Sequence, residues 1–139
     1  MTVSKSARAA LIILLAALYL VAGRAHILDP APFLTITPGW VPWPAAVVYW
    51  TGIAEIAGAC ALLQPFGQRL RQAAAIGLAA YALCVWPANF NHFVIDLSRE
   101  SGGWGLGYHI PRLAFQPVLI WAPLWASRIL AWPFARPKS

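Results

Sequence analysis

The chain has 139 residues, enough for one domain, and 60% of them are hydrophobic while only 10% are charged. A soluble domain usually carries about 25% charged residues, so a chain of this composition is too apolar to stay dispersed in water. The net charge of +6 comes from lysines and arginines at the ends of apolar segments, where topology-setting charges are placed. There is no basic stripe and no phosphate-binding glycine loop, so we expect no nucleic-acid partner and a lipid bilayer instead.

Four apolar segments are long enough to cross a membrane, since a spanning helix needs about 20 mostly apolar residues. The second contains one charge, Glu55, whereas the third is uncharged throughout. The fourth follows Pro111, which suits the first turn of a helix. Lipid offers no water to open backbone groups, so helix is the expected form. We therefore predict an all-α fold, an integral membrane four-helix bundle in a single domain (residues 1–139), with helices at 7–28, 45–64, 72–93 and 112–132.

The segments between the predicted spans differ in character. Residues 29–44 (DPAPFLTITPGWVPWP) hold five prolines and two tryptophans, so they cannot form a regular helix. Tryptophan favours the headgroup layer, and we expect an outer cap that lies on the membrane. Residues 94–110 include SGGWGLG, which is typical of a flexible loop.

The orientation follows from the lysines and arginines, which are enriched on the cytoplasmic side. Consecutive spans alternate in direction, so the chain start, the loop at 65–71 and the chain end share one side. That side has seven such residues against three (Arg24, Arg99 and Arg112) on the other. The seven are Lys5, Arg8, Arg69, Arg71, Arg128, Arg136 and Lys138. We therefore expect both termini in the cytoplasm.

A basic start followed by a short apolar core is also typical of a signal peptide. The core here has about 15 residues before Arg24, which fits that alternative. No A-x-A cleavage sequence follows the core. We therefore expect the segment to remain as the first span.

Glu55 is the most informative residue, because it lies halfway along the second predicted span. An ionised side chain near the bilayer centre costs at least about 2.5–3.5 kcal/mol, so Glu55 is expected to face other helices. Thr51, Gly52, Gly58 and Ala59 share its helical face, and small residues let another helix approach closely. Two interpretations stay open: a proton- or ligand-binding group, or a protonated carboxyl that holds helices together.

Polar side chains also occur where the other three predicted spans meet the outer surface. Asn89 and Gln116 lie deepest, and Gln116 shares a helical face with Arg112 because the two are four residues apart. Residues near a headgroup layer are often polar for solvation alone, which is the alternative interpretation of Arg24 and His92. No catalytic residue can be named. The expected ligand- or proton-binding pocket consists of Glu55, His26, Asn89, His92, Arg112 and Gln116.

Metal binding and thiol chemistry receive less support. His26, His92 and His109 come from different segments without metal-binding spacing. Facing histidines on two helices could hold a haem, but interfacial histidines are common, and we expect no metal. Cys60 and Cys84 lie at depths that differ by about 9 Å, whereas a disulfide needs Cα atoms within about 7 Å. We therefore expect two free thiols.

Several short motifs occur in an order that resembles a known family. They are Gly23-Arg24-Ala25-His26, the VPWP that ends the cap, Gly52-Ile53-Ala54-Glu55, Pro87-Ala88-Asn89, and Arg112 to Gln116 with Trp121. From Leu15 to Arg128 the chain resembles the DoxX-like family of small four-helix bacterial membrane proteins. Arg24 and the SGGWGLG loop depart from that pattern.

The resemblance implies a small inner-membrane subunit or partner of a quinone-linked redox system. Quinone is then the candidate cofactor, although no residue demands one, and redox proteins or a second copy of the chain are the candidate partners. Whether the protein is an enzyme stays open, because no residue here identifies electron transfer. Two alternatives remain: a non-enzymatic membrane scaffold or assembly factor, and a small proton-coupled exporter.

Overall fold

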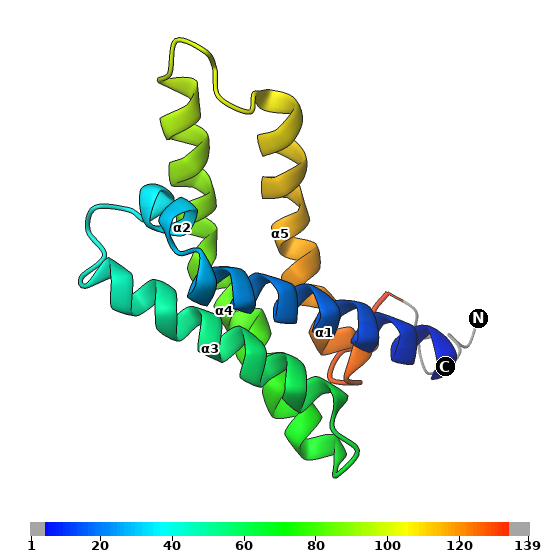
Figure 1. Cartoon of the computed structure of the whole chain (residues 1–139). Coiled ribbons are helices and arrows are strands. Elements are labelled where there is room, and N and C mark those ends of the chain that lie inside the picture. The colour runs from blue at the N-terminus through cyan, green and yellow to red at the C-terminus, as the bar shows by residue number, and fades with distance from the viewer. Residues whose placement is uncertain (1–4, 134–139) are drawn as a thin grey trace.

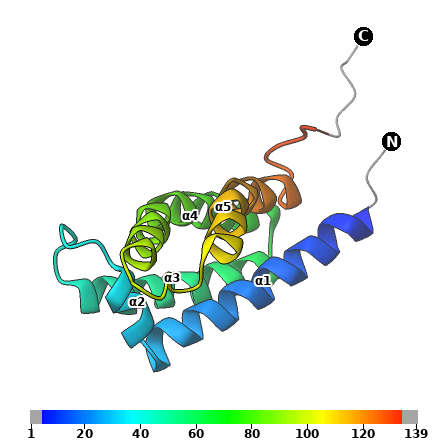
Figure 2. The same ribbon diagram turned by 90° about the horizontal axis from the view of Figure 1, so that it is seen from above.

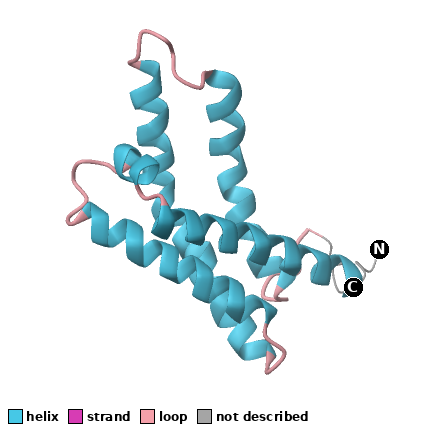
Figure 3. Ribbon diagram, viewed as in Figure 1, coloured by secondary structure: helices cyan, strands magenta, loops and turns pink. Residues whose placement is uncertain are grey.

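A computed structural model describes residues 5–133 of the chain. Within them it contains α1 (Lys5–Leu28), α2 (Ala31–Ile36), α3 (Pro44–Leu63), α4 (Gln68–Leu97) and α5 (Leu106–Ala126). The described residues include no strand (Figure 3), so the all-α prediction is confirmed. Arg136 and Lys138, which contributed to the expected orientation, lie outside the described residues.

The four long helices form two pairs. α1 packs along α3, and α4 packs along α5, while α3 also contacts α4 and α1 contacts α5. Figure 1 shows that the far half of the α4–α5 hairpin projects beyond α1 and α3. The view from above in Figure 2 places α4 and α5 on one side of the α1–α3 pair. The two pairs therefore cross and meet over only part of their lengths.

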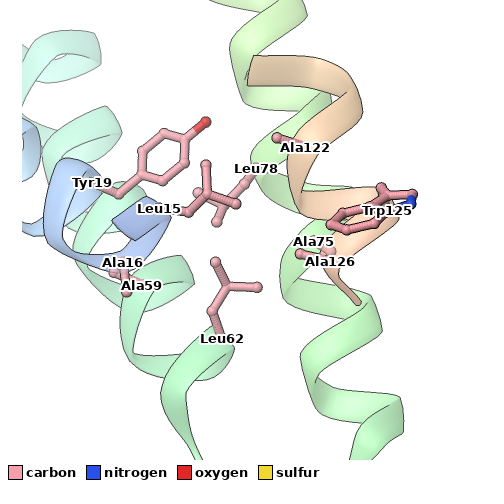
Figure 4. Close-up of a cluster of buried hydrophobic side chains, with 10 residues drawn as sticks. All are labelled: Leu15, Ala16, Tyr19, Ala59, Leu62, Ala75, Leu78, Ala122, Trp125 and Ala126. Atoms are coloured by element: carbon pink, nitrogen blue, oxygen red, sulfur yellow. The ribbon is translucent and has the colours of Figure 1, made fainter. Parts of the chain in front are cut away.

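The apolar core lies where the two pairs cross. Figure 4 shows its buried side chains, which come from all four long helices. Many are small, and small residues let membrane helices approach closely. In contrast, large apolar side chains such as Leu14 and Val21 are 66% and 71% exposed, as expected for residues that face lipid. The core comprises Leu15, Ala16, Tyr19, Ala59, Leu62, Ala75, Leu78, Ala122, Trp125 and Ala126.

Three helices, α1, α3 and α4, are long and apolar enough to cross a membrane. This supports the prediction of a membrane protein with transmembrane helices. α5 has 21 residues, but His109, Arg112 and Gln116 reduce its apolar character. The four-span bundle is therefore supported for three of its four members.

The predicted ends of the third and fourth helices are wrong at the α4–α5 loop. α4 continues to Leu97 instead of ending at 93, and α5 begins at Leu106 instead of 112. Residues 94–97 contain no proline or glycine to stop the helix. Pro111 lies inside α5, where it removes one backbone donor without ending the helix.

α5 also ends earlier than predicted, at Ala126 instead of 132. Arg128 takes the left-handed conformation, with φ of 62°. The Ile129 N–H donates to the Leu124 carbonyl at 2.9 Å, and the Arg128 N–H donates to the Trp125 carbonyl at 3.1 Å. These two bonds form a Schellman motif, which ends a helix by pairing its last free carbonyls.

The cap between the first two spans is more regular than its proline content predicted. Residues 31–36 form the short helix α2, which has a proline in its first turn, where a missing N–H costs nothing. The Asn91 side chain donates to the Ile36 carbonyl at 2.8 Å. The Phe33 ring stacks on His26 with centroids 3.8 Å apart. The cap is therefore attached to both α1 and α4.

Candidate functional site

A close contact between α1 and α3 positions the first two site residues. Gly23 and Gly52 are both buried, and a Cβ added to Gly52 would lie only 2.8 Å from the Gly23 carbonyl oxygen. The two backbones therefore touch, as small residues permit in membrane helices. His26 follows Gly23 by three residues, and Glu55 follows Gly52 by three. Residues three apart share a helical face, so the glycine contact brings His26 and Glu55 together.

Glu55 faces other helices, with a relative exposure of 3%. His26 Nδ1 lies 2.8 Å from Glu55 Oε2 and 3.0 Å from the Ala22 carbonyl oxygen. One ring nitrogen therefore approaches two acceptors, and a single N–H cannot satisfy both fully. Tyr81 of α4 lines the same cavity as Glu55. The Glu55 side chain of α3 thus lies beside His26 of α1 and near α4.

A second polar contact joins α4 to α5 beside the proline in α4. Asn89 Nδ2 donates to Gln116 Oε1 at 3.1 Å, and Gln116 Nε2 donates to the Ala82 carbonyl. Gln116 is buried, and both of its side-chain polar atoms have a hydrogen-bond partner inside the protein. Pro87 lies inside α4 between Ala82 and Asn89. The amide pair therefore fixes α5 against α4 at this position.

Arg112 is the cation of the site. Its Nη1 lies 2.6 Å from His92 Nδ1, which must accept because a guanidinium group only donates. Its guanidinium also lies 5.6 Å from the centre of the Tyr108 ring. The ion pairs among the described residues do not include Arg112. Arg112 is therefore a half-buried cation with no carboxylate at ion-pair distance among the described residues.

Two cavities open onto these residues. One has a volume of about 200 Å³ and lies between the cap, α3 and α4, with His26 and Thr51 in its wall. The other has a volume of about 230 Å³ and lies between α1, α4 and α5, with Glu55 and Gln116 in its wall. The remaining lining residues are mainly apolar in both. The two cavities share four lining residues, Tyr81, Val85, Asn89 and Arg112.

Five of the six residues proposed from the sequence thus line one cavity or both, and His92 does not. His92 instead contacts Arg112 from outside and belongs to a separate cluster with Asp96 and His109. The two cysteines are free and exposed, and Cys84 also lines the first cavity.

Tyr81 and Asp96 are the functional candidates that sequence reasoning missed. Tyr81 looks like an ordinary apolar-helix residue until α4 is placed against Glu55. Asp96 lies four residues after His92, which puts both on one helical face. The predicted helix end at 93 concealed that signal.

Asp96 is buried, and its Oδ2 accepts from the Trp104 backbone N–H at 3.0 Å. Arg99 Nη1 lies 3.1 Å from its Oδ1. The loop passes directly over the carboxylate at Gly103, where φ is 56° and a Cβ would lie 2.2 Å from Asp96 Cγ. The α4–α5 loop is therefore closed around this side chain.

Comparison with known proteins changes the family assignment. A family model described as "Domain of unknown function (DUF8561)" matches residues 15–129. The resemblance to the DoxX-like family is therefore wrong, since the match to this stretch is to DUF8561 and no DoxX match accompanies it. The motifs behind that resemblance are each only a few residues long. No curated protein and no solved structure matches the chain.

Proposed function

Because the chain belongs to DUF8561, a family without an assigned activity, we propose its function from the pocket itself. We infer a membrane-embedded binding protein for a small, largely apolar molecule whose head group is anionic or accepts hydrogen bonds. The implied role in a redox complex came from the DoxX-like resemblance and loses that basis. A quinone remains one member of this ligand class, because its carbonyl oxygens accept hydrogen bonds.

The observation that carries this proposal is the position of Arg112. This cation lines both cavities and has no carboxylate partner among the described residues. A half-buried cation is stabilised by an anion or a strong acceptor, and hydrogen bonds to a charged group contribute about 1.5–3 kcal/mol. The apolar walls on either side of Arg112 suit the body of such a ligand.

The membrane arrangement that accompanies this proposal has α5 as a fourth span. Its 21 residues extend about 32 Å, which is enough for a hydrocarbon layer of about 30 Å. Lys5, Arg8 and Arg128 line one hollow at the surface, so the start of α1 and the turn after α5 lie at the same end of the molecule. We place that basic end in the cytoplasm, as positive charges favour.

The proposal is tested by ligand binding in lipid nanodiscs. A short-chain quinone and a twelve-carbon fatty acid serve as probes, and tryptophan fluorescence follows the titration. We expect at least one probe to bind. Arg112→Gln should weaken the binding of that probe by about 10- to 100-fold, which corresponds to the loss of about 1.4–2.8 kcal/mol from a charged hydrogen bond. Arg24→Gln is the matched control, because Arg24 is exposed and lines neither cavity.

The result that contradicts the proposal is clear. If neither probe binds, or if Arg112→Gln and Arg24→Gln bind with the same affinity, Arg112 does not recognise a ligand. Thermal unfolding of both variants must resemble that of the wild type for this comparison to hold.

A scaffold function is the second candidate, and one observation favours it. The Glu55 carboxyl already lies 2.8 Å from His26 Nδ1 beside the glycine contact between α1 and α3, which suits a purely structural group. Glu55→Gln separates the two functions. If Glu55 is purely structural, the variant should keep whatever probe binding the wild type has, and its free energy of unfolding should change by no more than about 1–2 kcal/mol. If Glu55 belongs to the ligand pocket, the variant should keep its fold and lose probe binding.

A further inference from the structure

Two imidazoles and one carboxylate converge at the far end of the α4–α5 hairpin. His92 and Asp96 lie one turn apart on α4, and His109 faces them from α5. Each offers one ligand atom, and these atoms all lie within 4.8 Å of one another. His109 Nε2 is 2.9 Å from Asp96 Oδ2, and His92 Nε2 is 3.5 Å from the same oxygen. The three side chains therefore point at one place.

We propose that His92, Asp96 and His109 bind a first-row divalent transition-metal ion such as Zn²⁺. Imidazole nitrogen and carboxylate oxygen are ordinary zinc ligands, and three protein ligands leave a fourth position for water or another group. Two histidines and one carboxylate also form the set that holds non-haem iron. The two imidazole donors thus disfavour hard ions such as Mg²⁺, which prefer oxygen ligands.

The geometry needs only a small adjustment to hold such an ion. Tetrahedral zinc with bonds of about 2.0–2.1 Å requires ligand atoms about 3.4 Å apart. The two distances to Asp96 Oδ2, 2.9 and 3.5 Å, already bracket that value. His92 is the most exposed of the three, at 14% of its side chain. Its rotation can bring the third pair of ligand atoms within range.

Burial supports a preformed site. The side chains of Asp96 and His109 are each 1% exposed, and a charge this deeply buried is normally paired or coordinates a metal. His109 Nδ1 is buried without a hydrogen-bond partner among the described residues. Nε2 instead donates to Asp96 Oδ2 at 2.9 Å, so coordination through Nε2 replaces this hydrogen bond and the proton of the neutral ring then lies on Nδ1.

The ion can reach the site from water. α4 has 30 residues and extends about 45 Å, which exceeds the hydrocarbon thickness of about 30 Å. The cluster lies near the end of α4, in the half of the hairpin that projects beyond α1 and α3 (Figure 1). Arg99 and Glu100 next to it are exposed.

Two arginines compete with the metal ion for its ligands, and this competition lowers the affinity of the site for the ion. Arg99 pairs with Asp96, with Nη1 3.1 Å from Oδ1. Arg112 donates to His92 Nδ1 at 2.6 Å, and a neutral histidine that coordinates through Nε2 carries its proton on Nδ1. That nitrogen can then no longer accept from Arg112. Metal binding therefore releases Arg112, a residue that lines both cavities, from His92.

The test uses metal-stripped full-length protein in detergent, titrated with Co²⁺ for its absorption spectrum and with Zn²⁺ by calorimetry. Wild-type protein should bind one ion. Asp96→Asn and His109→Gln should each weaken binding at least about 100-fold, because each removes one of three ligands. His26→Gln is the matched control, since His26 is the remaining histidine of the chain and lies outside the cluster.

A variant that gains affinity keeps the test independent of folding. Arg99→Gln removes an exposed competitor for Asp96 and should tighten Zn²⁺ binding by about fivefold, the equivalent of one surface ion pair. Misfolded protein cannot produce that gain. Absence of Zn²⁺ binding in both wild-type and Arg99→Gln protein overturns the proposal. Equal losses in His26→Gln and His109→Gln also overturn it, because binding would then not come from this cluster.

Discussion

Gly52→Ala tests the contact that brings His26 and Glu55 together. The added Cβ would lie 2.8 Å from the Gly23 carbonyl oxygen, 2.8 Å from His26 Cβ and 3.1 Å from Ile27 Cγ1. The first two neighbours are backbone or attached directly to it, so they cannot rotate away. α1 and α3 must therefore separate by several tenths of an ångström, and the 2.8 Å approach of His26 to Glu55 lengthens with them.

The magnitude follows from two opposing terms. Overpacking a well-packed contact costs about 1–3 kcal/mol, and the rigid neighbours place this case toward the upper end. Alanine favours a helix over glycine by about 1 kcal/mol. We therefore expect Gly52→Ala to lower the free energy of unfolding by about 1–2 kcal/mol.

Gly77→Ala provides the control within the same chain. Gly77 lies in α4, and a Cβ added there would meet nothing within 4 Å. Gly77→Ala should show only the helix preference of alanine, which raises the free energy of unfolding by up to about 1 kcal/mol. The difference between the two variants therefore isolates the steric cost at the α1–α3 crossing.

The measurement is reversible unfolding in mixed micelles with increasing SDS, followed by tryptophan fluorescence. Gly23→Ala should behave like Gly52→Ala, because its Cβ would lie 2.6 Å from the Gly52 carbonyl oxygen. Equal stabilities for Gly52→Ala and Gly77→Ala would refute the close contact on which the site depends.

Two further predictions concern the membrane arrangement and the second polar contact. A reporter that is active only outside the cytoplasm should be silent when fused after Ser139 and active when inserted after Ser101; the reverse pattern would refute the proposed orientation. Gln116→Leu removes the acceptor of Asn89 and the donor to the Ala82 carbonyl, and should destabilise the protein by about 1–2 kcal/mol in the same SDS titration. An unchanged unfolding curve would show that this amide does not hold α5 against α4.

The sequence by itself indicated a membrane environment and a helical secondary structure. Long apolar segments with few charges require lipid, and lipid leaves helix as the form that satisfies its own backbone. The first two long helices were predicted at 7–28 and 45–64 and occur at Lys5–Leu28 and Pro44–Leu63. Polar residues and prolines bound these segments on both sides, so local signals were enough to place their ends.

The family assignment could not be made from short motifs. G-x-x-H and G-x-x-E each describe a glycine contact that places a polar residue three positions later. Such a contact follows from helix packing in lipid, so unrelated small membrane proteins can share it. The match over residues 15–129 uses the whole pattern of the chain and decided differently.

Only the tertiary structure decided where α4 and α5 meet and which polar groups face each other. Asp96 and His109 were not grouped by sequence because their contact spans a loop that closes when the Trp104 N–H reaches the carboxylate. The end of α5 depends on Arg128 in a left-handed conformation, for which an arginine gives no local signal. Such partners lie far along the chain or outside the residue's ordinary preference, so their pairing becomes visible only when the helices pack.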